Sequence, residues 1–209
     1  ANIHRGLYKE AERASKEYEE ARKASARFIG AGSDEIIFTA GATDSSNKLF
    51  YSLGQSGFLK EGDEIVTTIM DHHAVLLPLQ ALVKRKKLIL RYIPLEVINT
   101  LDYGQAEKLI TNKTKIVVLT LASNVLGTIN DVARVARRAH EVEALVVVDA
   151  TAAVGHIPVD VQLLDADFLF FSGHKMCGPT GVGVLYGKKS ELAKVEPSFL
   201  GGGIVEEVT

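Results

Sequence analysis

Short apolar runs with almost no polar alternation constrain the fold of this chain more than any other feature. Three of them are KIVVLTL (residues 115–121), ALVVVDA (144–150) and DFLFFS (167–172). A strand with one face in water alternates apolar and polar residues, whereas a strand covered on both faces does not. These runs therefore predict strands in the middle of a sheet that has helices on both sides.

Segments with helical character separate most of the strand-like runs. An alternation of this kind is typical of α/β folds, in which crossover helices join parallel strands. We therefore expect one three-layer α/β/α domain over residues 1–209, with a mostly parallel sheet of roughly seven strands. The further strands are expected at 35–39, 64–68, 88–93 and 181–187, and the helices at 6–29, 43–54, 74–86, 103–111 and 131–141.

Charge and composition remove several classes of function. The 24 basic and 26 acidic residues are mixed along the chain, so the basic surface that nucleic acid requires is not expected. No apolar run approaches the ~18 to 20 residues of a membrane span and no signal peptide opens the chain, which predicts a cytoplasmic protein without membrane contact. The single cysteine, Cys177, leaves no internal disulfide and no cysteine-based metal site.

Polar residues directly follow five of the predicted strands. Open parallel sheets bind ligands beyond the carboxyl ends of their strands. We therefore expect these polar groups to converge on one crevice. They are Gly41-Ala42-Thr43, Asp71-His72-His73, Ser123-Asn124, Asp149-Ala150-Thr151 and Ser172-Gly173-His174-Lys175.

The segment TAGATDSSN (39–47) has the pattern of a phosphate-binding turn. A strand passes through glycine into a helix whose first turn carries Thr43 and other small polar residues. Free backbone N–H groups, the helix dipole and a hydroxyl together bind phosphate well. The alternative is that Thr43 simply caps the helix.

Asp149 and Lys175 end two successive predicted strands. A carboxylate at the end of ALVVVDA is expected to be semi-buried and to need a cation, for which a protonated ring nitrogen would serve. A lysine amine at such a strand end can form a Schiff base. The alternatives are an aspartate that caps the next turn and a solvated loop lysine. Taken together, a phosphate seat, a carboxylate and a lysine are the three anchors that pyridoxal phosphate needs.

Several segments resemble one enzyme family. SGHK followed by GPTGVGVLYG, with MDHH and SNVLGTIND, resembles the cysteine desulfurases of the class V aminotransferase group, which are pyridoxal-phosphate enzymes of fold type I. NIHRG, GDEIV and FLGGG are similar to the Suf branch, and GATDSSN and VDATAAVG to the Nif and Isc branch. The resemblance implies that residues 1–209 form the large cofactor-binding domain, with the family's N-terminal segment and small C-terminal domain outside the chain.

The resemblance also implies roles for individual residues. Lys175 would form the Schiff base, and His72 would stack on the ring face and move protons at the substrate, which makes these two the catalytic residues. Capping the following helix is the alternative for His72, and shaping the turn before Gly127 is the alternative for Asn124. His73 and His4 are expected to have no catalytic role. The complete expected cofactor site is Ala42, Thr43, His72, Asn124, Asp149, Ser172, His174 and Lys175, without a metal.

The reaction that the resemblance implies is the conversion of L-cysteine to L-alanine, with persulfide sulfur passed to an acceptor or an iron–sulfur scaffold protein. The family's homodimer is implied as well, as are a nucleophilic cysteine and a substrate-binding arginine beyond Thr209. This chain alone is therefore expected to be inactive, and we interpret Cys177 as a packed structural residue. The alternatives are a selenocysteine lyase, another class V enzyme, or a non-catalytic binding or scaffold protein.

One departure from the family generates a prediction. Three residues after the aspartate, the family carries a glutamine that donates to the cofactor's hydroxyl, and this chain has Ala152. Restoring the donor with Ala152→Gln should shift the titration of the Schiff base, by a free energy of ~0.5 to 1.5 kcal/mol for a neutral hydrogen bond. The measurement is absorbance against pH, and identical curves for the two proteins would contradict it.

Overall fold

One seven-stranded sheet organises the computed structural model, which describes residues 8–200. The strand order is β1-β7-β6-β5-β4-β2-β3. β7 is antiparallel to its neighbours β1 and β6, and the other pairings are parallel, so the expectation of a mostly parallel sheet is confirmed. The strands are β1 (Ile36–Thr39), β2 (Glu64–Thr68), β3 (Ile89–Ile93), β4 (Thr114–Thr120), β5 (Leu145–Asp149), β6 (Phe168–Ser172) and β7 (Gly183–Gly187).

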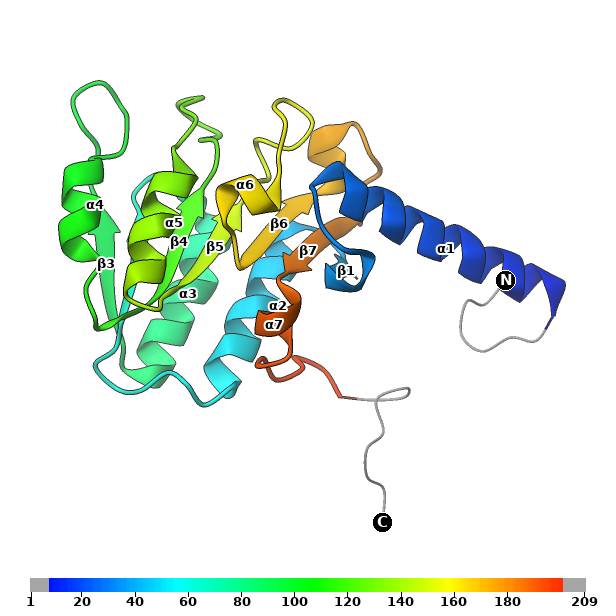
Figure 1. Ribbon diagram of the computed structural model, residues 1–209, viewed down its shortest axis with the longest axis horizontal. Helices are drawn as coiled ribbons and strands as arrows, with labels where there is room; N and C mark the ends of the chain where they lie inside the picture. The colour runs from blue at the N-terminus through cyan, green and yellow to red at the C-terminus, as the bar shows by residue number, and fades with distance from the viewer. Residues whose placement is uncertain (1–7, 201–209) are drawn as a thin grey trace, which may run out of the picture.

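Helices cover both faces of the sheet and complete the expected three layers. Figure 1 shows α2 and α3 on one face and α4, α5 and α6 on the other, while α1 projects from the body. No helix of residues 8–200 is both long enough and apolar enough to cross a membrane. The helices are α1 (Lys9–Phe28), η1 (Ser33–Glu35), α2 (Ala42–Gln55), α3 (His73–Lys86), α4 (Tyr103–Leu109), α5 (Val132–Glu141), α6 (Val161–Leu164), η2 (Gly173–Met176) and α7 (Lys189–Leu192).

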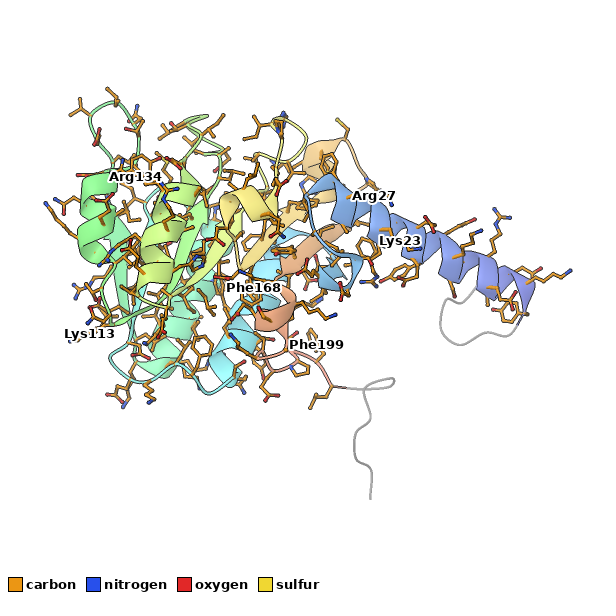
Figure 2. The ribbon with its side chains drawn as sticks, in the orientation of Figure 1. Lys23, Arg27, Lys113, Arg134, Phe168 and Phe199 are labelled. Atoms are coloured by element: carbon orange, nitrogen blue, oxygen red, sulfur yellow. The ribbon has the colours of Figure 1, made fainter. Side chains whose placement is uncertain are left out.

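The central strands lack polar alternation because both of their faces are buried. In β4, Ile116 and Val118 pack with α2 and α3, whereas Val117 and Leu119 pack with the helices of the opposite layer. Figure 2 shows Phe168 of β6 inside the molecule, where it is fully buried. At ~25 cal/mol per Å² of apolar surface, burial on two faces makes these strands the most strongly stabilised part of the fold.

A close backbone approach joins β7 to the turn that follows β1. Gly183 lies opposite Thr39 in the β1–β7 pairing, and a Cβ atom added to Gly183 would lie 2.5 Å from Gly41 Cα. Gly41 itself has φ 151°, a conformation that other residues rarely adopt. The two glycines therefore let the turn at the start of α2 press against β7.

A partly buried cluster of ionisable side chains ties β5 to β6 at the amino ends of these strands. Asp167 Oδ2 accepts hydrogen bonds from Val146 N at 2.8 Å and from His140 Nε2 at 3.0 Å, and His140 Nδ1 lies 2.9 Å from Asp165. Burial opposes the charged imidazole, but the two carboxylates outweigh it and raise the pKa of His140. These three side chains and the amide of Val146 thus form one hydrogen-bonded cluster, which we call the clasp.

The glycine contact predicts that Gly183→Ala destabilises the chain by about 1 to 3 kcal/mol, because the new methyl group meets backbone atoms that cannot move aside easily. The measurement is the free energy of unfolding in urea. Gly104→Ala in α4 is the matched control, since its Cβ would meet only Asp102 Oδ1 at 3.4 Å. That control should stabilise the chain by about 0.5 to 1 kcal/mol. Equal stability of Gly183→Ala and the wild type would contradict the prediction.

Candidate active site

The eight predicted site residues line one cavity of about 150 Å³ at the carboxyl edge of the sheet. They come from the ends of β5 and β6 and from the segments that follow β1, β2, β4 and β6, as the strand pattern predicted. The lining residues are Ala42, Thr43, His72, Asn124, Asp149, Ser172, His174 and Lys175, together with Ala74, Val75, Thr120, Ala122, Thr151, Ala152 and Phe170.

Thr120, Val75 and Phe170 also line the cavity but were not predicted as site residues. Val75 and Phe170 are fully buried apolar residues of regular elements, so nothing in the sequence separates them from the rest of the core. Thr120 ends β4, and its hydroxyl donates to Ala122 O at 2.9 Å. The position of Thr120 at the end of a strand was the one feature of the sequence that could have identified it as a site residue.

The first turn of α2 presents its amides to the cavity. Gly41 is the N-cap and no side chain caps the helix, so the alternative that Thr43 is the cap is wrong. The helical ladder begins with the bond from Ser45 N to Gly41 O at 2.9 Å, and Ala42 N donates to Ser172 Oγ at 2.8 Å. The amide of Thr43 precedes the ladder and lies at the positive end of the helix dipole.

The Asp149 carboxyl group lies on the cavity wall and is only 6% exposed. Its Oδ1 accepts a hydrogen bond from Thr151 N at 2.8 Å, so Asp149 does bind the next turn, as the alternative interpretation held. Burial raises the pKa of Asp149, against hydrogen bonds from Thr151 and the charge of His72. A cation placed against this carboxylate would therefore be bound strongly.

His72 both lines the cavity and caps α3. Its Nδ1 accepts a hydrogen bond from Ala74 N at 3.1 Å, which leaves the proton of the neutral ring on Nε2. Burial lowers the pKa of His72, and the charges of His73 and Lys175 lower it further, against Asp149. The neutral ring thus offers a flat face and one N–H donor. His73 does not line the cavity, and His4 lies outside the described residues.

Lys175 and His174 belong to η2, the short helix that follows β6, and both are exposed at the cavity. Cys177, two residues later, ends η2 in the left-handed conformation with φ 62° and is exposed. The prediction that Cys177 is a packed structural residue is therefore wrong, because the chain reverses at this position and leaves the thiol in solvent. Cys177 also lies outside the cavity lining.

Asn124 lies at the cavity entrance in an exposed turn. The turn is held by Ser123, whose Oγ accepts hydrogen bonds from Val125 N at 3.3 Å and Leu126 N at 3.1 Å. Asn124 is thus not the residue that shapes the turn. Across residues 8–200, no group of three or more histidine, cysteine and acidic side chains is arranged to hold a metal ion.

Comparisons with known proteins agree with this geometry. The family model described as aminotransferase class-V matches residues 1–209. The chain is 43% identical over 211 residues to a cysteine desulfurase from Haloferax volcanii. That alignment covers 100% of this chain and 49% of the relative. The apo structure of a cysteine desulfurase from Thermococcus onnurineus aligns with a TM-score of 0.95 and 43% identity, over 100% of this chain and 52% of that one.

A further solved structure, SspA in complex with cysteine, aligns with a TM-score of 0.88 and 28% identity, over 98% of this chain and 58% of that one. The chain spans about half the length of the curated relatives that it matches. The fold, the family match over every residue and the whole-chain identities support one assignment. The chain belongs to the class-V aminotransferase family.

Proposed function

We propose that this chain is the cofactor-binding domain of a pyridoxal-phosphate-dependent cysteine desulfurase. The observation that carries the proposal is the convergence of Lys175, Asp149 and the first turn of α2 on one cavity. An amine, a buried carboxylate and a set of helix amides match the aldehyde, the ring nitrogen and the phosphate of that cofactor. The similarity to cysteine desulfurases over the whole chain selects this activity within the family.

The residues present fit the cofactor chemically. Burial raises the pKa of Asp149, so a protonated ring nitrogen beside it would restore the ionised carboxylate in a low-dielectric site. Ser172 is 5% exposed, and its Oγ already accepts a hydrogen bond from Ala42 N. This bond holds the first turn of α2 next to the segment that carries His174. These groups would bind the phosphate, together with the Thr43 amide and hydroxyl. When bound, the cofactor supplies an electron sink for carbanion chemistry at the substrate Cα.

The side chains of the cavity would divide the remaining work. Lys175 supplies the amine that holds the cofactor and that accepts the substrate's Cα proton once it is free. His72 offers the face of a neutral ring and the Nε2 proton, while its Nδ1 is engaged with Ala74 N. A proton on Nδ1 would break that helix cap, so His72 acts as a stacking group and donor. Asn124, at the entrance, would contact the substrate carboxylate.

The sulfur-transfer step is proposed to use residues beyond this chain. Cys177 is the chain's one thiol and lies outside the cavity lining, so it is not assigned as the sulfur acceptor. A cysteine in the other half of the family's length would take the substrate sulfur as a persulfide and pass it to an iron–sulfur assembly partner. Because of the family resemblance, we also propose that the full-length protein is a homodimer in the cytoplasm.

Cofactor binding tests the site directly. Lys175→Ala should lose the covalent absorbance band with pyridoxal phosphate, because the amine that holds the aldehyde is gone. Asp149→Asn should weaken binding by ~30-fold or more, from about 2 kcal/mol or more for removing one partner of a buried charge pair. Lys113→Ala, an exposed lysine remote from the cavity, is the control and should bind like wild type. Equal binding by Lys175→Ala would refute the assignment.

Turnover tests the proposed reaction. A protein in which this chain is joined to the other half of the family's length should convert L-cysteine to equal amounts of L-alanine and transferred sulfur. Both products should be lost in Lys175→Ala and retained in Lys113→Ala. Alanine is measured by chromatography and sulfur as sulfide released by a thiol reductant. Transfer of the amino group to a keto acid, without sulfur release, would instead indicate an aminotransferase.

A further inference from the structure

Asp71 closes the turn that delivers His72 to the cavity. It lies three residues after the end of β2, where its own amide donates to Thr68 O at 3.2 Å. Its Oδ2 accepts hydrogen bonds from Thr67 Oγ1 at 2.6 Å and from Thr68 N at 3.0 Å. These three bonds bind Asp71 back onto β2. Because His72 follows directly, the position of its ring depends on this turn.

The Asp71 carboxyl group is buried and only half satisfied. The residue is 5% exposed, and its Oδ1 is a buried oxygen without a hydrogen-bond partner among residues 8–200. An ionised carboxylate has about four acceptor sites to satisfy, so an orphaned oxygen makes the charged form costly here. Burial, with a further contribution from Asp149, raises the pKa of Asp71 to about 7 against the hydrogen bonds from Thr67 and Thr68.

Asp71 and Asp149 are both buried, and the charge of Asp149 favours the protonated form of Asp71. The charge of Asp149 also acts on the His72 ring, as do the charges of His73 from α3 and Lys175 from η2. A second buried negative charge that interacts with the first is unfavourable. Asp149 lines the cavity and Asp71 does not, so a cation in the cavity favours the charge on Asp149.

We propose that Asp71 is a positioning residue that stays protonated in the folded chain, so that Asp149 alone carries the negative charge and the turn before His72 stays closed. The inference deepens the proposed function. It rests on that function only in taking the protonated ring nitrogen of pyridoxal phosphate as the cation beside Asp149. A neutral Asp71 keeps its acceptor Oδ2 on Thr67 and Thr68 and adds no second charge to that of Asp149. The electrostatics of the site are then set by one carboxylate.

The proton on Asp71 is tested in the chain without cofactor. Asp71→Asn mimics the neutral acid, because its amide oxygen can accept the same two hydrogen bonds. The pKa of Asp71 is raised in the folded state, so its stabilisation is complete below the ordinary value of about 4 and is lost as pH rises to about 7. Between those values, the unfolding constant of the wild type should rise about tenfold per pH unit relative to Asp71→Asn, and the ratio should level off above pH 7.

Parallel pH profiles for the two proteins would overturn the proposal. A direct measurement covers the case in which Asp71→Asn does not fold. In the wild type labelled with carbon-13 at aspartate, the side-chain carbon of Asp71 should titrate with a midpoint near 7. A midpoint near the ordinary value of about 4 would show that Asp71 is ionised and would also overturn it.

The positioning role is tested by pyridoxal-phosphate binding at pH 6. Asp71→Asn should bind within about twofold of wild type, and Asp71→Ala, which removes the acceptor of two hydrogen bonds, about tenfold more weakly, as 1.4 kcal/mol implies. Asp167→Asn is the matched control, since Asp167 is equally buried but lies at the opposite edge of the sheet. It should lower stability without weakening binding. Equal affinity of Asp71→Ala and wild type would refute positioning.

These measurements separate the inference from the proposed function. If the folded wild type binds no pyridoxal phosphate, the proposed function fails, while the pH profile of the cofactor-free chain still decides where the proton lies. If the wild type binds the cofactor and the profiles are parallel, only the inference fails.

Discussion

The hydrogen bond from Ala42 N to Ser172 Oγ joins residues 130 positions apart, and the geometry of the site depends on it. It ties the first turn of α2, which presents backbone amides, to the end of β6, where Lys175 follows in η2. The bond forms because Gly183 and Gly41 let β7 and the turn after β1 come together without a side chain between them. The proposed phosphate seat and the proposed lysine anchor are therefore held as one unit before a ligand binds.

The sheet provides the stability that this polar edge requires. Two buried carboxyl groups, Asp71 and Asp149, cost folding free energy because both lose water, and Asp71 Oδ1 has no hydrogen-bond partner among residues 8–200 to replace it. Strands buried on both faces, such as β4 and β5, offset that cost and place the polar groups at fixed strand ends. The cavity thus combines a strongly stabilised sheet with buried polar side chains that lower the stability of the fold, which is the usual arrangement of a functional site.

Much of the fold and of the cavity could be predicted because both depend on local patterns. Continuous apolar runs located the seven strands, and their ends gave the eight expected cavity residues. The short helices α6 and η2 have too few residues to show a helical period. The Gly41 cap, the exposed thiol of Cys177 and the orphaned oxygen of Asp71 could not be predicted, because each depends on chain directions or contacts that form only in the folded sheet.

The clasp of His140, Asp165 and Asp167 makes the stability of the amino end of β5 depend on pH. The raised pKa of His140 means that its stabilisation is complete below about pH 6.5 and is lost as pH rises through the folded value. The same clasp holds the amide of Val146 in β5, the strand whose other end carries Asp149. His140 therefore binds its proton more strongly in the folded chain, and mildly acidic solution favours the ordered form of the strand that anchors the site.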